Sequence, residues 1–373
     1  MKGIQLANEY ISKHKNAVVD KYRLDYHIIP PVGWINDPNG LIFFGGKYHT
    51  YCQFNPYDTR AGVMYWGHFV SDDLVAHNFD GVAIAPLADN ASVFSGGAIE
   101  YGGKIAALYT LHTECGDYKS EEVFLAFSED GGEFTGHKKV FVNDGLPENL
   151  CRTDFRDPCP VEINGKYYVF VGGKDKKLNK GVIIVLGGDT LENLAYEFYL
   201  GPYYELGDMG ECPSYFKIGG KDVLVASGCH VPERGNDFKN VNSSVFIVGN
   251  LNFEKGEMAV DFIREIDKGD AFYAPQFIRG AKEPVVIGWL EMWNKPYPTH
   301  DMKHGWVGAL SFPRTLSLKN GELFQQPFEI PEKYLSDVAN GEIPKCADVK
   351  FVFEGKGNLI IESQNGKLII GND

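Results

Sequence analysis

The chain of 373 residues carries 50 Asp and Glu against 36 Lys and Arg, a formal net charge of −14 at pH 7. This acidic balance argues against nucleic-acid binding, because contacts to phosphates need clustered Lys and Arg. The 43 glycines exceed the usual share of about 7%, so turns must be frequent. The 13% of aromatic residues fit a large β core or a sugar-stacking surface.

Cysteine usage and the lack of long apolar segments predict a soluble cytoplasmic protein. Residues 1–30 have no apolar region of a secretory signal, and no run of about 18 apolar residues predicts a membrane span. The odd number of cysteines and the lack of a C-x-x-C pair make a disulfide framework or a zinc ribbon unexpected. The seven are Cys52, Cys115, Cys151, Cys159, Cys212, Cys229 and Cys346.

The sequence predicts no metal site and no cofactor. His49, His68, His77 and His112 are scattered without an H-E-x-x-H or similar ligand spacing, so surface or core histidines are the simpler interpretation. No glycine loop that could cradle a phosphate precedes a helix, which argues against a nucleotide cofactor.

Along the chain, one short helix is expected first and strands follow. Residues 5–23 fit an amphipathic helix whose apolar positions are Leu6, Tyr10, Ile11, Val18 and Tyr22. From residue 34 onward strand–turn–strand units dominate. Residues 41–44, the glycine pair 45–46 and residues 47–54 predict a hairpin with a two-residue loop.

A turn followed by an apolar strand recurs about every 60 residues, after Lys47, Lys104, Lys166, Lys221 and Lys282. This period fits one four-stranded blade with its loops, so five copies predict a five-bladed β-propeller. Coincidence is the alternative interpretation, because Gly-Lys turns are common in any β protein.

We therefore expect an all-β fold with four segments. They are a helical lead-in at 1–30, a five-bladed propeller at 31–330, a linker at 331–348 and C-terminal strands at 349–373. A hairpin around Asn320-Gly321 closes the repeating pattern. Three short strands are expected at 349–354, 359–362 and 367–370, which are too few to bury a core alone.

Three acids stand in unusual settings: Asp37 and Asp157 directly before a proline, and Glu211 in Gly-Glu-Cys-Pro. Retaining cleavage of a glycoside needs a carboxylate nucleophile and a carboxyl proton donor. The tight turn after Asp37 favours it as the nucleophile, because a short side chain on a rigid turn has few rotamers to lose. Glu211 reaches further, and its apolar neighbours are expected to raise its pKa, as an acid/base requires.

Asp157 follows Arg156, a cation that is expected to keep it ionised so that it can bind substrate hydroxyls. Each acid also has a simpler interpretation. Asp37 can be part of an ordinary turn, Asp157 can form a local ion pair, and Glu211 has no signal of its own. Together, on a repeating and aromatic-rich β scaffold, the three favour a glycosidase site.

These motifs resemble glycoside hydrolase family 32, the invertase and β-fructosidase family. Its Trp-x-Asn-Asp-Pro-Asn-Gly, Arg-Asp-Pro and Glu-Cys-Pro motifs stand here in order, at 34–40, 156–158 and 211–213. Other stretches similar to the family lie at 51–56, 65–68, 94–96, 272–276 and 296–316. The resemblance covers roughly residues 20–330 and is greatest for the helix-led bacterial sucrose or sucrose-6-phosphate hydrolases.

The resemblance implies a propeller with a central pocket and retaining hydrolysis of β-fructofuranosides through a fructosyl-enzyme. Candidate substrates are sucrose, sucrose 6-phosphate and short fructo-oligosaccharides. By motif, Asp37 attacks the fructosyl carbon, Glu211 is the acid/base and Asp157 holds ring hydroxyls. The implied substrate-binding residues are Asn36, Gln53, Trp66, Phe94, Ser95, Arg156, Asp267, Asp270, Tyr273 and Trp289.

The sequence also departs from the family. Gly210 stands where an aromatic residue is common, which is expected to open the pocket beside the acid/base. Ala271 stands where an acid is common, so the sequence leaves open whether Asp267 or Asp270 binds the second sugar. The family's C-terminal β-sandwich is expected here only as a truncated segment of about three strands.

Two other functions stay open: a fructosyltransferase on the same scaffold, and a non-catalytic sugar-binding propeller. A small sugar is the expected partner, with no nucleic acid and no membrane. The preferred sugar and the oligomeric state stay undecided.

Overall fold

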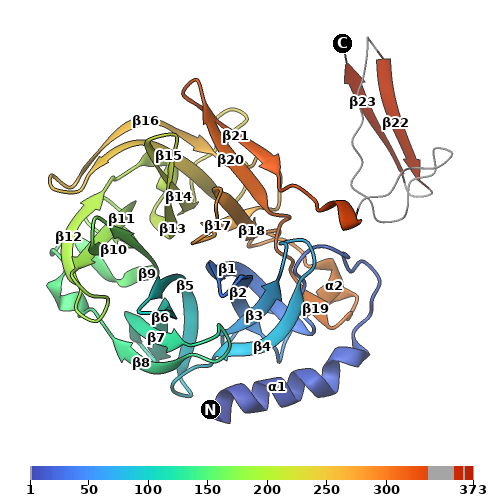
Figure 1. Cartoon of the computed structure of the whole chain (residues 1–373), viewed down its shortest axis with the longest axis horizontal. Coiled ribbons are helices and arrows are strands. Elements are labelled where there is room, and N and C mark those ends of the chain that lie inside the picture. The colour runs from blue at the N-terminus through green and yellow to red at the C-terminus, as the bar shows by residue number, and fades with distance from the viewer. Residues whose placement is uncertain (1, 335–356, 364–365, 373) are drawn as a thin grey trace. The chain divides into compact units, whose positions relative to one another are not determined.

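The protein is described by a computed structural model that covers residues 2–334, 357–363 and 366–372. Two compact units divide the chain, residues 1–330 and 331–373. The first unit contains five sheets, which surround a common centre (Figure 1), and the second contains one two-stranded sheet. The predicted all-β, five-bladed propeller is confirmed.

Each blade is an antiparallel sheet of four strands, and the first carries one added strand. Blade 1 contains β1 (Gly33–Phe44), β2 (Lys47–Asn55), β3 (Tyr65–Ser71), β4 (Asn78–Ile84) and the added β19 (Trp306–Val307). Blade 2 contains β5 (Ala91–Tyr101), β6 (Lys104–Cys115), β7 (Tyr118–Ser128) and β8 (Thr135–Lys139). Blade 3 contains β9 (Leu150–Ile163), β10 (Lys166–Asp175), β11 (Lys180–Gly188) and β12 (Ala195–Leu200).

Blade 4 contains β13 (Met209–Ile218), β14 (Lys221–Cys229), β15 (Asn242–Asn252) and β16 (Glu257–Glu265). Blade 5 contains β17 (Tyr273–Phe277), β18 (Val285–Trp289), β20 (Arg314–Lys319) and β21 (Glu322–Pro327). The helices are α1 (Lys2–His14) and α2 (Pro298–Asp301), with 3₁₀ turns η1 (Lys15–Ala17), η2 (Asn143–Gly145), η3 (Tyr204–Leu206) and η4 (Glu332–Tyr334).

The sequence repeat marks the second strand of every blade. Four of its lysines are the first residues of β2, β6, β10 and β14, and Lys282 lies just before β18. The first predicted hairpin is also confirmed. Gly45 and Gly46 join β1 to β2 with φ of +58° and +80°, as a two-residue hairpin loop with both central residues at positive φ requires.

The N-terminal helix is shorter than the predicted 5–23. It ends at His14, a 3₁₀ turn follows, and Val18 is already extended. Ile4, Ala7 and Ile11 form its buried face, spaced as one side of a helix requires. The predicted apolar position Leu6 falls off that face and is 60% exposed.

The hydrophobic core is divided among the interfaces between neighbouring blades. Separate clusters join blade 1 to blade 2, blade 2 to blade 3, blade 3 to blade 4 and blade 4 to blade 5. Another cluster joins blade 5 to blade 1 and includes α1. Because the middle strands face a neighbouring blade on both sides, their sequences are almost continuously apolar, as at 182–186 in β11. Full burial of each such side chain stabilises the fold by about 1.5–3 kcal/mol.

The ring closes where blade 5 meets blade 1. The short strand β19 pairs in parallel with the start of β1. Further along, the Phe43 amide donates to the Arg279 carbonyl at 2.7 Å, and the Arg279 amide donates to the Leu41 carbonyl at 2.8 Å. These backbone bonds join residues from opposite ends of the propeller sequence.

The described residues of the second unit are 331–334, which include η4, and two strands. The predicted strands 359–362 and 367–370 lie within β22 (Gly357–Ser363) and β23 (Gly366–Asn372), which pair as a hairpin. The predicted strand 349–354 and the linker from residue 335 onward lie outside the described residues. The four predicted segment boundaries stay a prediction.

Candidate active site

Each blade contributes a bulged inner strand to the centre of the ring. The strands β1, β5, β9, β13 and β17 surround the centre (Figure 1), and each breaks register with its neighbour. A β-bulge bends its strand and re-aims nearby side chains. One break in each strand lies at 35–38, 94–96, 156–159, 211–214 and 273–276, and β1 and β9 each have a second one.

Three of these breaks hold a residue in the left-handed region. Asp157, Cys212 and Ala274 have φ of +65°, +47° and +50°, and each precedes a proline. Such a conformation costs about 1–3 kcal/mol for a residue other than glycine. The Asp-Pro and Cys-Pro motifs therefore mark points where the inner strand leaves regular pairing.

A cavity of about 270 Å³ lies where the five bulges meet. Nine of the predicted site residues line it: Asn36, Asp37, Gln53, Phe94, Ser95, Arg156, Asp157, Glu211 and Tyr273. The sequence did not point to the other lining residues, which are Ala61, Gly62, Met64, Cys229, Asn242 and Trp293.

Four predicted substrate-binding residues do not line this cavity. Trp66 and Trp289 have no exposed surface, and Trp66 donates its Nε1–H to the Phe94 carbonyl at 3.1 Å. Asp267 pairs with Arg314 Nη1 at 2.7 Å, and the exposed Asp270 lies 3.6 Å from an ammonium. The two tryptophans therefore support the wall, and the two acids lie elsewhere.

Asp37 is held by a short chain of hydrogen bonds. The Trp34 indole donates to Asn36 Oδ1 at 2.8 Å, and Asn36 Nδ2 donates to Asp37 Oδ1 at 3.0 Å. Ser95 Oγ donates to the other carboxylate oxygen at 2.8 Å. Burial raises the pKa of Asp37, while the bonds from Ser95 and Asn36 oppose that rise. The carboxylate is therefore fixed in orientation.

Glu211 is bound by a guanidinium on one oxygen and a phenol on the other. Arg156 donates Nε–H and Nη2–H to Glu211 Oε1 at 3.1 and 2.8 Å, and Tyr273 donates its hydroxyl to Oε2. Burial works to raise the pKa of Glu211, but the Arg156 charge and these hydrogen bonds outweigh it, so the pKa is lowered. The expectation that apolar neighbours raise this pKa is wrong.

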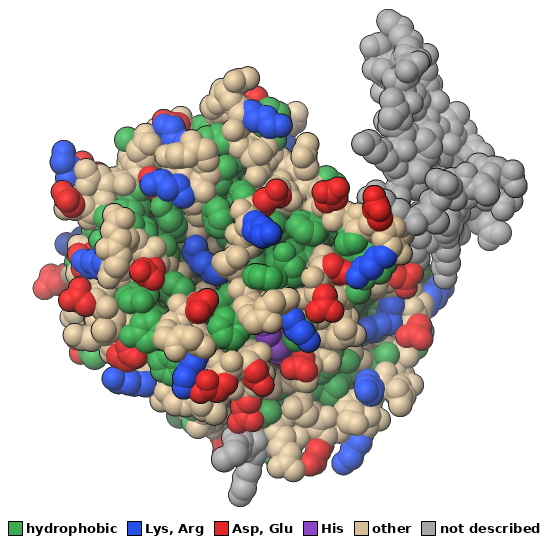
Figure 2. Space-filling model, viewed as in Figure 1, with side chains coloured by type: hydrophobic (Ala, Val, Ile, Leu, Met, Phe, Trp, Pro, Cys, Tyr) green, Lys and Arg blue, Asp and Glu red, His purple; other side chains and the backbone are tan. Residues whose placement is uncertain are grey.

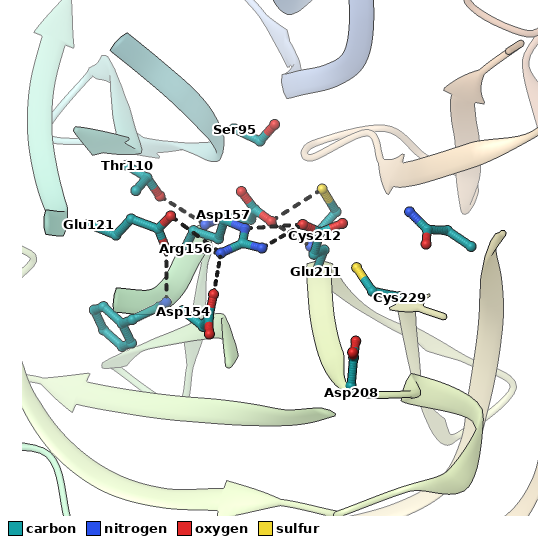
Figure 3. Close-up of polar contacts among 12 residues, drawn as sticks. Ser95, Thr110, Glu121, Asp154, Arg156, Asp157, Asp208, Glu211, Cys212 and Cys229 are labelled. Atoms are coloured by element: carbon teal, nitrogen blue, oxygen red, sulfur yellow. Dashed lines mark hydrogen bonds and ion pairs between the residues drawn. The ribbon is translucent and has the colours of Figure 1, made fainter. Parts of the chain in front are cut away.

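Asp157 shows the opposite behaviour. Burial raises its pKa to about 7, and the nearby Glu211 and Asp37 carboxylates add to the rise that Arg156 opposes. Its Oδ2 accepts the Cys212 amide at 2.9 Å. The expectation that Arg156 keeps Asp157 ionised is also wrong, because burial outweighs the charge of Arg156. The guanidinium hydrogen bonds of Arg156 go to other carboxylates (Figure 3).

Gly210 does not widen the pocket. A Cβ at this position would lie 2.8 Å from the Val182 carbonyl oxygen in blade 3, so a side chain would point there. Across the same interface, a Cβ on Gly172 would lie 2.4 Å from the Gly210 oxygen. These glycines let β13, which carries Glu211, approach blade 3 closely.

Glu121 on β7 is a further residue at this site. Its Oε2 accepts Arg156 Nη1–H at 3.0 Å and the Phe155 amide at 3.0 Å. No motif surrounds it in the sequence. The only sequence signal is that Val123 and Leu125, which share its strand face, are both apolar, since alternate residues of a strand point to one side.

Among the residues that the structure describes, no group of three or more His, Cys, Asp or Glu side chains is arranged to hold a metal ion. In the same residues, no helix is long and apolar enough to cross a membrane. Acidic and basic side chains are interspersed over the face of the propeller seen in Figure 2.

Comparison with known proteins agrees with this site. Residues 27–327 match the model of the glycosyl hydrolases family 32 N-terminal domain. The chain belongs to glycoside hydrolase family 32. Sucrose-6-phosphate hydrolase of Escherichia coli is 32% identical over 345 residues, which cover 90% of this chain and 70% of that relative. The Bacillus subtilis (strain 168) enzyme of that name is 33% identical, with coverage of 87% and 68%.

Solved structures of the family share the fold. The Bombyx mori GH32 β-fructofuranosidase BmSUC1 aligns with a TM-score of 0.81 and 33% identity, over 90% of this chain and 72% of that chain. The Lactobacillus gasseri sucrose-6-phosphate hydrolase aligns with a TM-score of 0.79 and 27% identity, over 87% and 67%. The predicted family and the predicted glycosidase class are confirmed.

Proposed function

We propose that the protein is a retaining β-fructofuranosidase that cleaves sucrose, sucrose 6-phosphate or short fructo-oligosaccharides. One observation carries this proposal. Asp37, Asp157 and Glu211 come from three blades and line one cavity of about 270 Å³. A retaining glycosidase needs such carboxyl groups on either side of the scissile bond.

Asp37 is the nucleophile in this proposal. Its Oδ1 and Oδ2 are held by Asn36 and Ser95, so little side-chain freedom is lost when it attacks the anomeric carbon of the fructosyl unit. The attack forms a bond from a carboxylate oxygen to that carbon, while the bond to the leaving sugar oxygen breaks. Pre-positioning of the reacting groups lowers the barrier because their freedom is lost before the reaction.

The carboxyl cluster supplies the proton. The Asp37, Asp157 and Glu211 carboxylates lie close enough to disfavour one another's ionisation, so a macroscopic pKa of about 7 belongs to the cluster more than to Asp157 alone. We expect substrate hydroxyls to donate to Asp157 and favour its ionised form. The proton is then held by Glu211, which transfers it to the leaving oxygen and later removes one from the attacking water.

Two kinds of relative support the choice of substrate. The Bombyx mori enzyme was also solved as a mutant in complex with sucrose, and several similar bacterial enzymes are named sucrose-6-phosphate hydrolases. A small sugar is therefore the partner that we propose. Cytoplasmic localisation stays part of the proposal.

Release of fructose tests the proposed function. The purified chain and its Asp37→Asn variant are incubated separately with sucrose and with sucrose 6-phosphate. We expect the wild type to release fructose from at least one of them. We expect the variant to lose at least about 1,000-fold in kcat, which corresponds to about 4 kcal/mol in the activation free energy at 1.36 kcal/mol per tenfold change. A variant that keeps wild-type turnover would exclude Asp37 as the nucleophile.

The two other functions give different products. A fructosyltransferase would release glucose in excess over fructose and form longer oligosaccharides. A binding-only propeller would retain sugar affinity and release nothing.

A further inference from the structure

Arg156 lies between two carboxylates, of which only one belongs to the pocket lining. Nε–H and Nη2–H are directed to Glu211, and Nη1–H is directed to Glu121, with a longer contact of 3.4 Å to Asp154 (Figure 3). All three nitrogens of the guanidinium are thereby engaged. The orientation of Arg156 toward Glu211 therefore depends on what holds its other end.

Burial separates the two carboxylates. The Glu211 side chain is 18% exposed and Arg156 is 15% exposed, whereas the Glu121 side chain is only 1% exposed. Glu121 is also absent from the lining of the cavity. A substrate in the cavity can therefore contact Arg156 and Glu211, whereas Glu121 lies behind Arg156 and binds its Nη1.

Glu121 is nevertheless kept as an anion. Burial opposes ionisation, but the neighbouring His112, Arg156 and Lys119 lower the pKa of Glu121 to about 2. Lys119 Nζ lies 3.2 Å and His112 Nδ1 lies 3.4 Å from Glu121 Oε1. A buried ion pair is a weak source of stability, because desolvation offsets most of the attraction. Packing alone therefore gives little reason for a charge at this position.

We infer that Glu121 is a positioning residue: its buried carboxylate holds the Arg156 guanidinium in the orientation in which Nε and Nη2 meet Glu211. The inference rests on the proposed function only in giving Glu211 the acid/base role. Glu121 also offsets the positive charge of Arg156 as it acts on Glu211. When glutamine replaces Glu121, its side-chain oxygen can still accept Nη1–H from Arg156, so the main change is the lost negative charge. The anionic form of Glu211 is then favoured more strongly, and its proton leaves at lower pH.

Several other charged or titratable groups face the Glu121–Arg156 pair, and the test leaves them unchanged. They are His112 on β6, Lys119 on β7, Asp154 and Asp157 on β9, Glu211 on β13, and around Glu211 also Asp37, Cys229 and Tyr273.

The test compares Glu121→Gln with Glu122→Gln. Glutamine keeps the size and an acceptor oxygen but loses the charge. The control changes the neighbouring residue in the same way, and Glu122 pairs with Lys139 at 2.9 Å away from the cavity. We expect Glu121→Gln to lower kcat by about 10- to 100-fold with a smaller change in KM, as for the loss of an interaction made chiefly in the transition state. The control keeps wild-type kinetics.

The pH profile distinguishes positioning from a general structural role. In Glu121→Gln the basic limb of kcat/KM moves to lower pH, on the order of one pH unit, the scale expected for removing one nearby charge. Glu121→Asp keeps the charge but withdraws it from Arg156, so we expect a lower kcat with the basic limb near that of the wild type. If Glu121→Gln does not fold, the kcat and pH profile of Glu121→Asp test the inference instead.

A carbon-13 titration of the glutamate side-chain carboxyls gives a readout that needs no turnover. The Glu211 signal, identified by its loss in Glu211→Gln, titrates at lower pH in Glu121→Gln than in the wild type or Glu122→Gln. An unchanged Glu211 titration together with unchanged kinetics in Glu121→Gln overturns the inference. A wild type that releases no fructose refutes the proposed function, while the titration still decides the role of Glu121.

Discussion

At the scale of single residues, the environment shifts the pKa values of the three acids in different directions. Burial raises the pKa of both Asp37 and Asp157, whereas Arg156 lowers that of Glu211 despite burial. Opposed shifts within one cluster are typical of acid/base sites. The cluster of three acids with one guanidinium therefore retains a proton near neutral pH, and substrate binding decides which acid holds it.

The loss of turnover on removing the acid/base should depend on the leaving group. In Glu211→Ala we expect a fall of about 10²- to 10⁴-fold in kcat with substrates that have poor leaving groups, and a much smaller loss with an activated aryl fructoside. Azide should partly restore turnover of the activated substrate, because a small anion enters the space of the side chain and attacks without general-base help. Equal losses for both substrates with no azide effect would refute the assignment.

Asp157 should control the basic limb of the pH profile. Its pKa is raised to about 7, so the wild type is expected to lose kcat/KM as pH rises through about that value and the cluster loses its last proton. Asp157→Asn removes one negative charge, which lowers the pKa of the remaining acids and moves the basic limb to lower pH. The measurement is the residual kcat/KM at a series of pH values from about 5 to about 9, which covers the range in which the cluster titrates. A limb in the same place would exclude coupling between these acids.

The sequence predicted the three acids correctly as residues of one pocket, but not their electrostatics. The motifs around Asp37, Asp157 and Glu211 are local and can be recognised. The bond from Arg156 to Glu211 joins residues 55 positions apart, on different blades. Local neighbours suggested a raised pKa for Glu211 and an ionised Asp157. The contact with Arg156 reversed the first expectation, and burial reversed the second.

At the scale of elements, the site depends on how closely the inner strands approach one another. Gly172 on β10 faces β13, and a Cβ there would lie 2.4 Å from the Gly210 oxygen and 3.2 Å from the Glu211 Cα. Backbone cannot move away as a flexible side chain can. The distance between these strands therefore sets the position of Glu211.

Gly172→Ala should therefore affect both stability and catalysis. We expect a loss of about 1–3 kcal/mol in the free energy of unfolding, as for overpacking of a core, together with a lower kcat. Gly145→Ala is the control, because its Cβ would lie 3.8 Å from Phe141 Cζ, an ordinary contact. Denaturant melts and kinetics of both variants check this, and a Gly172→Ala variant with wild-type values would show that the interface is not tight.

A buried histidine pair links blade 1 to blade 2. His49 Nδ1 lies 3.0 Å from His68 Nε2, and His68 Nδ1 lies 3.1 Å from Asp80 Oδ2. His49 also packs against Gly131 of blade 2, whose added Cβ would lie 2.3 Å from the His49 ring. Burial and the neighbouring His68 lower the pKa of His49 to about 4.

This histidine should make the propeller sensitive to acid. Because the folded-state pKa of His49 is below the unfolded value of 6.5, the neutral ring contributes full stability above that pH. The contribution is lost as pH falls from 6.5 toward about 4, by roughly 1–2 kcal/mol after solvent screening. Melting temperatures at pH 7 and 5 should therefore differ less in His49→Gln than in the wild type. Equal differences would show that His49 does not contribute.

At the scale of the whole molecule, the blade number was predictable and the closure of the ring was not. The recurring lysine turns mark second strands, and the count of five follows from them. Part of the closure is β19, which contains only Trp306 and Val307 and pairs in parallel with β1. Two residues are too few for a strand pattern, so no periodicity could reveal this contact.

The bulged inner strands explain why one site forms on a repeating scaffold. Equivalent breaks in five blades direct different residues to one centre, so the repeat supplies the geometry and the sequence at each break supplies the chemistry. Of these breaks, the proline motifs marked three of the positions, at Asp37, Asp157 and Glu211. The contributions of Trp293 and Asn242 depend on loops and strand ends that no motif identifies.

The stereochemistry of the released fructose tests the central proposal most directly. Proton NMR follows sucrose, or sucrose 6-phosphate if that is the better substrate, during the first turnovers of the wild-type chain. We predict that the fructose appears first as the β-furanose and then equilibrates, because two displacements at one carbon retain configuration. Fructose that appears first as the α-furanose, or a folded chain that releases none, would contradict the account.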